Sequence, residues 1–265
     1  MIKCILCNTE KVSFYDNYKF HVINDKKYFG ETKIYKCNTC DFGFCDPMPK
    51  KENLNYFYNK VYRAAGRPHE INYHALDLQL YSHTNLNYLQ YLTTFIDFKK
   101  ISSVLDFGSG LGDIGYLLKK KFKHLELFSC ENDVYCKKVL SKREYTIYDY
   151  NNFDEINEKF DLIISTHSLE HMTNFQFLEM LKKKTHSNSY LFLEVPNCPL
   201  DDNYKNRPYD SPHLMFFSLK SLEELNKRFK FVTLNLNYSS YSLNQSFKYM
   251  KQFKQNYENW SIFNK

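Results

Sequence analysis

A glycine-rich stretch, VLDFGSGLGDIGYLL (104–118), combines residue types and spacing that could bind a nucleotide-like ligand. Gly108, Gly110 and Gly112 occupy every second position, and Gly115 completes a G-x-G-x-x-G pattern with the last two. Glycine lets the backbone approach a ligand closely, and the free N–H groups at the start of a following helix can hold a polar group. The stretch therefore predicts a ligand-binding turn between a strand and a helix.

Asp106 and Glu131 distinguish between the ligands that such a loop can hold. A dinucleotide loop requires an acidic residue about twenty positions further on for the ribose hydroxyls, and Glu131 meets that spacing. A Walker A loop requires Gly-Lys-Ser/Thr, which is absent from this stretch. Asp106 lies two residues before the first glycine. Its carboxylate disfavours a pyrophosphate and favours a ligand that carries cationic amino and sulfonium groups.

Four cysteines are spaced like the ligands of a metal ion. Cys4 with Cys7 and Cys37 with Cys40 form two C-x-x-C pairs, and two such pairs can complete a tetrahedron around zinc. A site closed by four thiolates is structural and not catalytic, because no position is open to substrate. The other cysteines lack this spacing and are expected to be small apolar residues: Cys45, Cys130, Cys136 and Cys198.

Length, composition and charge restrict the class of protein. The 265 residues, 43% hydrophobic and 18% aromatic, are enough for one full core with a small appendage. No run of about 18 apolar residues is present, and the start lacks the layout of a signal peptide. We therefore expect a cytoplasmic protein with no membrane partner. The formal charge of +6 comes from scattered lysines and short lysine runs, which are typical of solvated helix faces.

The elements that must position these residues fall into four segments. Residues 1–50 form the cysteine module, and residues 51–98 form a helical bridge. Within the bridge, apolar residues at helical spacing predict one long helix over 78–96. Residues 99–243 alternate strands with helices, which predicts a mostly parallel sheet with helices on both faces. Residues 244–265 form a C-terminal tail.

The run VLDFGSGLG resembles the D-x-G-x-G-x-G loop of class I S-adenosylmethionine-dependent methyltransferases. FDLIISTHSLEHM is similar to the fourth strand of that family with its "LEH" signature, and LFLEVPN is similar to the fifth. The resemblance covers residues 101–243 and implies an α/β fold with a doubly wound, mostly parallel, Rossmann-like sheet of about seven strands.

The same resemblance implies S-adenosylmethionine as the cofactor. The glycine loop wraps the methionine part, Glu131 holds the ribose hydroxyls, and the segment around Tyr148 lies by the adenine. The cofactor-binding residues that the resemblance implies are Asp106, Gly108, Ser109, Gly110, Gly112, Glu131, Asn132, Tyr148, Asp149 and His167.

The segment 35–62, YKCNTCDFGFCDPMPKKENLNYFYNKVY, looks like the zinc-bearing N-terminus of methyltransferases from polysaccharide and deoxysugar clusters. Those enzymes act on small nucleotide-linked sugars. The resemblance implies a nucleotide-linked small-molecule substrate, a sugar or a phosphoramidate-type group, that is a precursor of a bacterial capsule or surface polysaccharide. Enzymes that methylate base amines usually carry an Asn/Asp-Pro-Pro-aromatic motif after the fourth strand. That place reads STHSLEHM here, which argues against base N-methylation.

Three histidines are candidate catalytic residues: His213, His167 and His171. His213, in SPHLMFFS, matches the histidine of a Glu-His pair in the sugar C-methyltransferases of that group, but Pro212 replaces the glutamate. A single histidine fits an O-methyltransferase, because a base of near-neutral pKa can take the proton of a hydroxyl acceptor. The alternative is C-methylation of a nucleotide-linked keto-deoxysugar. A glutamate beside His213 in the structure, such as Glu170 or Glu194, would favour it.

Residues of the helical bridge are expected to close over the acceptor. Tyr58 and Tyr62 lie one helical turn apart and share a face. Arg63 and Arg67 have the same spacing and could meet an acceptor phosphate. Together with Glu194, these four form the predicted substrate site. A homo-oligomer is compatible with the sequence.

An RNA-binding protein, or an RNA methyltransferase whose zinc module grips RNA, is the alternative from another class. It requires a continuous basic stripe and predicts salt-sensitive affinity. The cysteine module has no run of arginines with interleaved aromatic residues. Its acidic residues are Glu10, Asp16, Asp25, Glu31, Asp41 and Asp46. The sequence therefore argues against a nucleic-acid partner.

Overall fold

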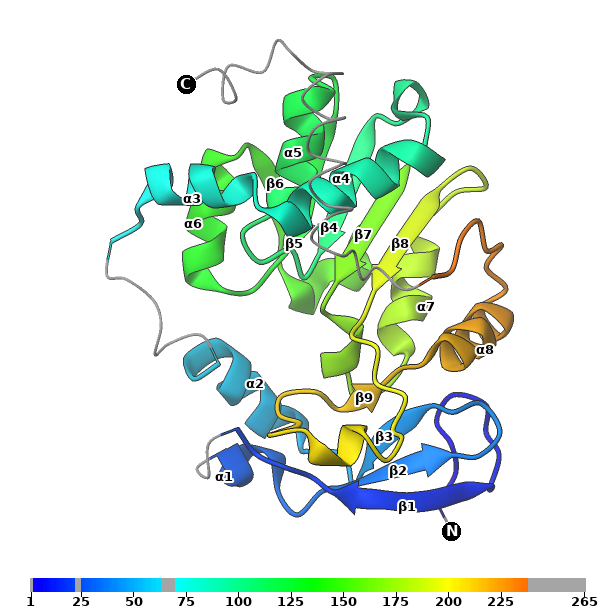
Figure 1. Cartoon of the computed structure of the whole chain (residues 1–265). Coiled ribbons are helices and arrows are strands. Elements are labelled where there is room, and N and C mark those ends of the chain that lie inside the picture. Colours follow the sequence, from blue (N-terminus) through cyan, green and yellow to red (C-terminus); the bar gives the residue numbers. More distant parts are fainter. Residues whose placement is uncertain (1, 22–24, 63–69, 238–265) are drawn as a thin grey trace.

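The structure of the protein is a computed structural model that describes residues 2–21, 25–62 and 70–237 (Figure 1). The strands are β1 (Val12–Asn17), β2 (Lys33–Cys37), β3 (Gly43–Asp46), β4 (Ser103–Phe107), β5 (Glu126–Cys130), β6 (Tyr145–Tyr148), β7 (Leu162–Thr166), β8 (Tyr190–Glu194) and β9 (Met215–Phe216). The helices are α1 (Lys26–Phe29), α2 (Lys51–Lys60), α3 (Tyr73–Leu80), α4 (His83–Phe95), α5 (Asp113–Lys121), α6 (Val134–Lys142), α7 (Gln176–Lys183) and α8 (Leu219–Phe229). A 3₁₀ turn, η5 (Leu169–His171), follows β7.

The larger sheet consists of five parallel strands in the order β6-β5-β4-β7-β8. The chain runs outward from β4 through β5 to β6, and then returns to the other side of β4 for β7 and β8. Because the connections after β4 and β7 leave in opposite directions, a crevice opens at the carboxyl ends of these two strands. This reversal is the place where a doubly wound sheet binds its ligand.

Side chains that alternate along β4 point into two different cores. Val104 packs in an apolar cluster with α4, α5 and α6, which cover one face of the sheet. Leu105 and Phe107 pack in a second cluster with α7 and α8, which cover the other face. Asp106 has the same parity as Val104, so its carboxyl group lies on the side of α5. The alternation confirms the α/β architecture with helices on both faces.

The smaller sheet belongs to the cysteine module and is antiparallel in the order β1-β2-β3-β9. Its last strand comes from the far end of the chain, because Gly43 of β3 pairs with Phe216 of β9. The ring of Phe42 lies 5.6 Å from that of Phe175 and 5.2 Å from that of Phe217. The module therefore shares one continuous apolar core with the face of the large sheet that α7 and α8 cover.

A buried ion pair fastens the β8–β9 connection to the cysteine module. The guanidinium of Arg207 pairs with the buried carboxylate of Asp210 and, at 3.1 Å, with Asp16 of β1. The backbone N–H of Lys19 donates to Asp210 Oδ2 at 2.7 Å. Because charges buried in this way are mutually compensated, they hold the loop in one position. That loop continues directly into His213.

The helical bridge differs from the single long helix that the spacing predicts. Helix α3 ends at Leu80, and α4 begins at His83. The hydroxyl of Ser82 accepts a hydrogen bond from the backbone N–H of Asn85 at 3.3 Å, as an N-cap residue does. The prediction of one helix was wrong because apolar spacing persists across the break, while the capping serine begins a new helix.

The described residues account for five strands of the parallel sheet and not for seven. Residues 231–237, which follow α8, form no strand in the structure. The predicted tail, 244–265, lies outside the described residues, as does the whole of 238–265. Among the described helices, none has the length and apolar character needed to cross a membrane.

Candidate active site

A cavity of about 420 Å³ lies at the carboxyl edge of the parallel sheet. Its wall includes residues that directly follow β4, β5 and β7, and the inner side of α2 covers it. Among its lining residues are Gly108, Glu131, Asn132, His167, His171, Tyr58 and Tyr62. The fold therefore brings predicted cofactor, catalytic and substrate residues to one cavity.

The glycine loop takes a backbone conformation that favours glycine at three positions. The φ angles of Gly108, Gly110 and Gly112 are 68°, 57° and 71°, in the left-handed region. A Cβ atom on Gly108 would lie 2.3 Å from Ser168 Oγ, and one on Gly112 would lie 2.5 Å from Leu140 Cδ2. At Gly108 and Gly112 both dihedral angle and space thus require glycine, and Gly108 brings bare backbone to the cavity.

The carboxylate of Glu131 joins the glycine loop to the start of α6. Its Oε2 accepts from the backbone N–H of Gly110 at 2.9 Å, and its Oε1 accepts from that of Asp133 at 2.9 Å. Ser109 meets Ser129 of β5 through their hydroxyls at 2.7 Å. These bonds hold an acidic group at the mouth of the loop, in the place where the resemblance puts the ribose hydroxyls.

Asp106 lies beneath the loop and does not line the cavity. Burial, together with the charges of Asp113 and Glu131, raises the pKa of the Asp106 carboxyl to about 7. A cationic group above the loop would favour the carboxylate and lower this pKa. Asp106 is therefore a buried titratable group beneath the loop.

His167 stands between two glutamates after the end of β7. Its Nδ1 lies 3.5 Å from Glu170 Oε1, and its Nε2 lies 3.0 Å from Glu194 Oε2. The contact with Glu170 raises the pKa of His167, and the charge of Glu194 adds to it. Its φ of 50° is unusual for a residue with a side chain, and such strain often occurs at functional sites. The side chain is 56% exposed, so the cation that it forms meets the cavity.

Glu170, His171 and His213 form a compact cluster beside the cavity. One side-chain donor atom from each residue lies within 4.8 Å of the other two. The two imidazole rings are 5.1 Å apart between centroids, and His171 Nε2 lies 3.8 Å from Glu170 Oε1. The backbone N–H of Leu214 donates to the carbonyl of Glu170 at 2.7 Å, which joins the two segments. Tertiary structure has thus placed a glutamate beside His213, where the local sequence has Pro212.

Burial controls the charges in this cluster. It lowers the pKa of His171 to about 4, and it also lowers the pKa of His213. Burial acts in the opposite direction on Glu170, but the contact with His167 and the neighbouring histidines outweigh it and lower the pKa of that carboxyl. At neutral pH the cluster therefore combines a buried carboxylate with two neutral imidazoles.

Helix α2 supplies the aromatic cover. The hydroxyl of Tyr58 lies 3.2 Å from His171 Nδ1 and donates to the carbonyl of Pro212 at 3.3 Å. The ring of Tyr62 lies 5.4 Å from Tyr58 and 6.0 Å from His171. The predicted shared face of the two tyrosines therefore points toward the histidines. Arg63 and Arg67 lie outside the described residues.

Two predicted adenine-side residues do not line the cavity. Tyr148 stacks on Phe128 at 6.0 Å, and Asp149 caps the following 3₁₀ turn by accepting from the N–H of Asn151. Tyr150 lines the cavity instead, and it lies 5.9 Å from Phe107 between ring centroids. Sequence reasoning missed Tyr150, although an aromatic residue just after a strand end was a usable signal.

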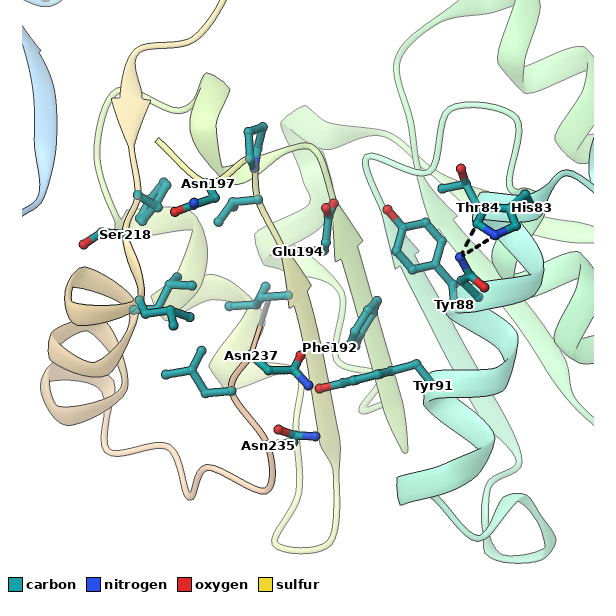
Figure 2. A pocket seen from close by; sticks show the side chains of 18 residues that line it. His83, Thr84, Tyr88, Tyr91, Phe192, Glu194, Asn197, Ser218, Asn235 and Asn237 are labelled. Carbon is teal, nitrogen blue, oxygen red and sulfur yellow. Dashed lines mark hydrogen bonds between the residues drawn. The ribbon is translucent and has the colours of Figure 1, made fainter. Parts of the chain in front are cut away.

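A larger hollow of about 650 Å³ lies between α4, β8 and α8 (Figure 2). Tyr88 of α4 and Phe192 of β8 line it, and Glu194 stands at its edge, facing Tyr88 (Figure 2). No residue of the glycine loop contributes to this hollow. Because β8 is the outer strand of the described sheet, the hollow lies at the sheet edge. Glu194 connects it to the cavity, because its carboxylate lies 3.0 Å from His167, which lines that cavity.

The four predicted metal ligands meet within the cysteine module, and three of them, Cys4, Cys37 and Cys40, belong to the core that the module shares with α7 and α8. The sulfur atoms of Cys4 and Cys40 are 3.8 Å apart, and those of Cys7 and Cys37 are 3.6 Å apart. Zinc–sulfur bonds of about 2.3 Å in a tetrahedron place two sulfurs about 3.8 Å apart. The donor set and its spacing therefore fit a structural zinc ion.

The comparison with protein families decides the class of the chain. A family model described as a methyltransferase domain matches residues 81–236, which is more than half of the chain. The chain belongs to this methyltransferase family. The predicted enzyme class, an S-adenosylmethionine-dependent methyltransferase, is thereby confirmed. The match begins before α4 and ends after α8, so it contains the glycine loop and the three histidines.

Solved structures similar to this methyltransferase are only distantly related. The plantazolicin methyltransferase BpumL, in complex with a monoazolic desmethylPZN analogue and SAH, has a TM-score of 0.46 and 16% identity over 64% of this chain and 78% of its own. Coclaurine N-methyltransferase has a TM-score of 0.45 and 19% identity over 66% and 56%. DesVI of Streptomyces venezuelae has a TM-score of 0.40 and 15% identity over 49% and 60%. A search of the curated proteins finds no match.

Proposed function

We propose that this methyltransferase transfers a methyl group from S-adenosylmethionine to an oxygen of a small nucleotide-linked acceptor. The resemblance of segment 35–62 supports a sugar or a phosphoramidate-type group, as a precursor of a bacterial surface polysaccharide made in the cytoplasm. The cavity of about 420 Å³ supports a small acceptor group. Its lining includes Lys51 as a cation for an acceptor phosphate, and Arg63 and Arg67 follow on the same segment.

The glycine loop and Glu131 are the proposed cofactor side. Glu131 exchanges its bond to the Gly110 N–H for the ribose hydroxyls, and the carboxylate of Asp106 attracts the cationic methionine part from below. Methyl transfer is an in-line displacement, so alignment of sulfur, methyl and acceptor oxygen supplies much of the rate enhancement. The cofactor supplies the electrophilic methyl group, and the chain's own residues hold and orient it.

The cluster of Glu170, His171 and His213 is the observation that most strongly supports the proposed acceptor site. Burial keeps both imidazoles neutral, so His213 can accept the proton of an acceptor hydroxyl. Glu170 lies within reach to stabilise the imidazolium that results. Tyr58 and Tyr62 lie over this cluster and limit its exposure to solvent.

C-methylation of a keto-deoxysugar is the second candidate, and the position of Glu170 favours it. The Glu-His pair of sugar C-methyltransferases is lost from the local sequence at Pro212. Glu170 brings a carboxylate back to His213 from the other side of the chain. Such a pair can remove a proton from carbon beside a carbonyl, and it can equally remove one from oxygen.

The zinc ion is proposed as a structural element of the acceptor side. Its module continues directly into α2, which carries Tyr58 and Tyr62. The module also shares its core with the large sheet, so a rigid module keeps α2 over the cavity. The alternative with RNA as substrate remains an outcome of the following test.

One labelling experiment tests the proposal. The protein is incubated with methyl-labelled S-adenosylmethionine and two separate pools, nucleotide-linked small metabolites and total RNA, and label is followed by mass spectrometry. We expect label in a nucleotide-linked metabolite, and fragmentation then separates oxygen from carbon attachment. Label in RNA alone would overturn the substrate proposal. Glu131→Ala should weaken cofactor binding, whereas His213→Ala should spare binding and lower turnover.

A further inference from the structure

The carboxylate of Glu170 is buried, and the described residues compensate its charge only through long contacts to histidines. Its side chain is 1% exposed, and neither carboxylate oxygen has a hydrogen-bond partner among the described residues. The contacts that it does make are to imidazole nitrogens, at 3.5 Å to His167 and 3.8 Å to His171. A buried charge without hydrogen bonds costs several kcal/mol or more unless a positive charge compensates it.

The donor atoms around this carboxylate match those of a metal ion. One oxygen of Glu170 and one ring nitrogen each of His171 and His213 lie within 4.8 Å of one another. Ligands that share a cation at bonds of about 2.1 Å are spaced roughly 3–4 Å apart, so small side-chain movements close the site. Two histidines and one carboxylate leave further coordination positions open, which is the pattern of reactive and not of structural metal sites.

The outer partners of His171 are also those of a metal-bound histidine. Its Nδ1 faces the Tyr58 hydroxyl at 3.2 Å and the Pro212 carbonyl at 3.4 Å. A proton on Nδ1 that is donated to a carbonyl leaves the lone pair on Nε2, the atom that faces Glu170. Metal-ligating histidines are oriented in this way by a carbonyl or carboxylate behind the ring. The carbonyl behind Nδ1 therefore favours the tautomer of His171 whose Nε2 is free to bind a cation.

We infer that Glu170, His171 and His213 bind a divalent first-row metal ion, such as Mn²⁺, at the acceptor end of the cavity. This inference rests on the proposed function, because the open positions of the ion would take an oxygen of the acceptor. The mixed nitrogen and oxygen donors differ from the four thiolates of the cysteine module, which select zinc. The chain thus has two metal sites of different chemistry.

With His213 bound to the ion as a ligand, the ion would replace the His213 base of the proposed function as the group that activates the acceptor hydroxyl. It binds the acceptor hydroxyl oxygen as a Lewis acid and lowers the pKa of that hydroxyl, so its proton leaves to water. The oxygen lone pair forms the new bond to the methyl carbon, and the electrons of the carbon–sulfur bond pass to sulfur. The products are the methylated acceptor and the neutral thioether, and the metal ion is unchanged.

Binding of Mn²⁺ alone tests the inference without any methyl transfer. The full chain, with zinc in the cysteine module checked by metal analysis, is titrated with Mn²⁺, and free Mn²⁺ is measured by electron paramagnetic resonance. Four thiolates are poor ligands for Mn²⁺, so the cysteine module does not interfere. We expect one Mn²⁺ per chain, and Glu170→Gln and His213→Gln should each weaken binding roughly tenfold to a hundredfold.

His186→Gln is the matched control. Its ring lies 2.9 Å from the carboxylate of Asp161, as a histidine–carboxylate pair that belongs to no three-donor cluster of the described residues. Mn²⁺ binding should be unchanged in this variant. Binding of S-adenosylmethionine and circular dichroism show that each variant is folded.

Two binding results would overturn the inference: a wild-type chain that binds S-adenosylmethionine but no Mn²⁺ at millimolar concentration, or equal Mn²⁺ affinity in Glu170→Gln and wild type. The proposed function fails separately, if Mn²⁺ binds as expected and no nucleotide-linked metabolite is methylated. Methyl transfer at full rate by protein free of Mn²⁺ would instead assign the proton to His213 as a base, against the inference.

Discussion

The cofactor side and the acceptor side of the cavity are built on different principles. The proposed cofactor side comes from adjacent strand–helix units within residues 104–150. Its shape depends mainly on glycines whose backbone lies in the left-handed region. The proposed acceptor side brings together Tyr58, His171 and His213 from three distant segments. Its chemistry depends on the buried carboxylate of Glu170 beside them. The difference shows that neighbours in the chain set the conformation of the proposed cofactor loop, whereas tertiary packing brings together the cluster of the proposed acceptor side and shifts its pKa values.

Both sides contain a buried carboxyl group, and their environments move its pKa in opposite directions. Burial beside other carboxylates raises the pKa of Asp106 to about 7. For Glu170, the surrounding histidines overcome the effect of burial and lower its pKa. A cationic ligand would therefore favour the ionised form of Asp106, whereas the histidines of the protein already favour the ionised form of Glu170.

The largest effect is expected for Glu170→Gln, which should change turnover and leave cofactor binding intact. Glu170→Gln should lower kcat roughly 10²- to 10⁴-fold, because the acceptor loses the group that supports deprotonation or holds the metal ion. The Kd of S-adenosylmethionine should stay within about twofold, as measured by calorimetry. An equal loss in Kd would mean that the two sides are one coupled unit, and the comparison would fail.

Gly108→Ala should do the opposite: it should weaken cofactor binding and leave the acceptor side intact. The substitution imposes a positive φ on alanine, which costs roughly 1–2 kcal/mol, and it places a methyl group against Ser168 Oγ at 2.3 Å. We expect the Kd of S-adenosylmethionine to rise roughly tenfold to a hundredfold by the arithmetic of binding. The Mn²⁺ affinity of the acceptor side should be unaffected.

Gly30→Ala is the control for that substitution. Gly30 also has a positive φ, 75°, but no atom lies within 4 Å of the position that its Cβ would take. It lies in the cysteine module, away from the glycine loop. A loss of stability with unchanged cofactor affinity is expected, and a comparable loss of affinity would show that backbone strain alone, wherever it lies, explains the effect at Gly108.

The pH dependence of cofactor binding tests whether the charge of Asp106 contributes to the affinity of the proposed cofactor side. Asp106 has a pKa of about 7 in the free protein, so most of it is protonated at pH 6 and ionised at pH 8. A cationic cofactor binds more tightly to the ionised form, and its affinity should fall about tenfold between pH 8 and pH 6. Calorimetry at a series of pH values measures this slope. Asp106→Asn should flatten it, and a slope that persists in the variant would assign the effect to other groups.

The smallest effect is expected at the aromatic cover. Tyr58→Phe removes the hydroxyl that faces His171 Nδ1 but keeps the ring and the Pro212 carbonyl in place. The loss of one of two outer partners should lower kcat/KM severalfold, in line with a single hydrogen bond of about 1 kcal/mol. Tyr62→Phe is the companion variant. Steady-state kinetics with the identified acceptor would show whether both hydroxyls act alike, in which case the contact to His171 has no special role.

The elements whose signal is local spacing could be predicted without the structure. The two C-x-x-C pairs and the glycine loop are such elements, because a tight turn or a left-handed backbone is specified by a few adjacent residues. The alternation of strands and helices likewise specified the parallel sheet. Spacing failed where two local rules compete: apolar periodicity continued through Ser82, but its capping bond divides the predicted helix.

The sequence by itself determined the class of enzyme, the order of most of its elements and the residues that form its glycine loop and its cysteine cluster. Only the tertiary structure decided that Glu170 stands beside His213, that β9 completes the sheet of the cysteine module, and that Tyr150 rather than Tyr148 lines the cavity. The physical reason is the range of the interactions. Dihedral preference and ligand spacing act between neighbours in the chain, whereas burial and charge depend on which distant segments the core brings together.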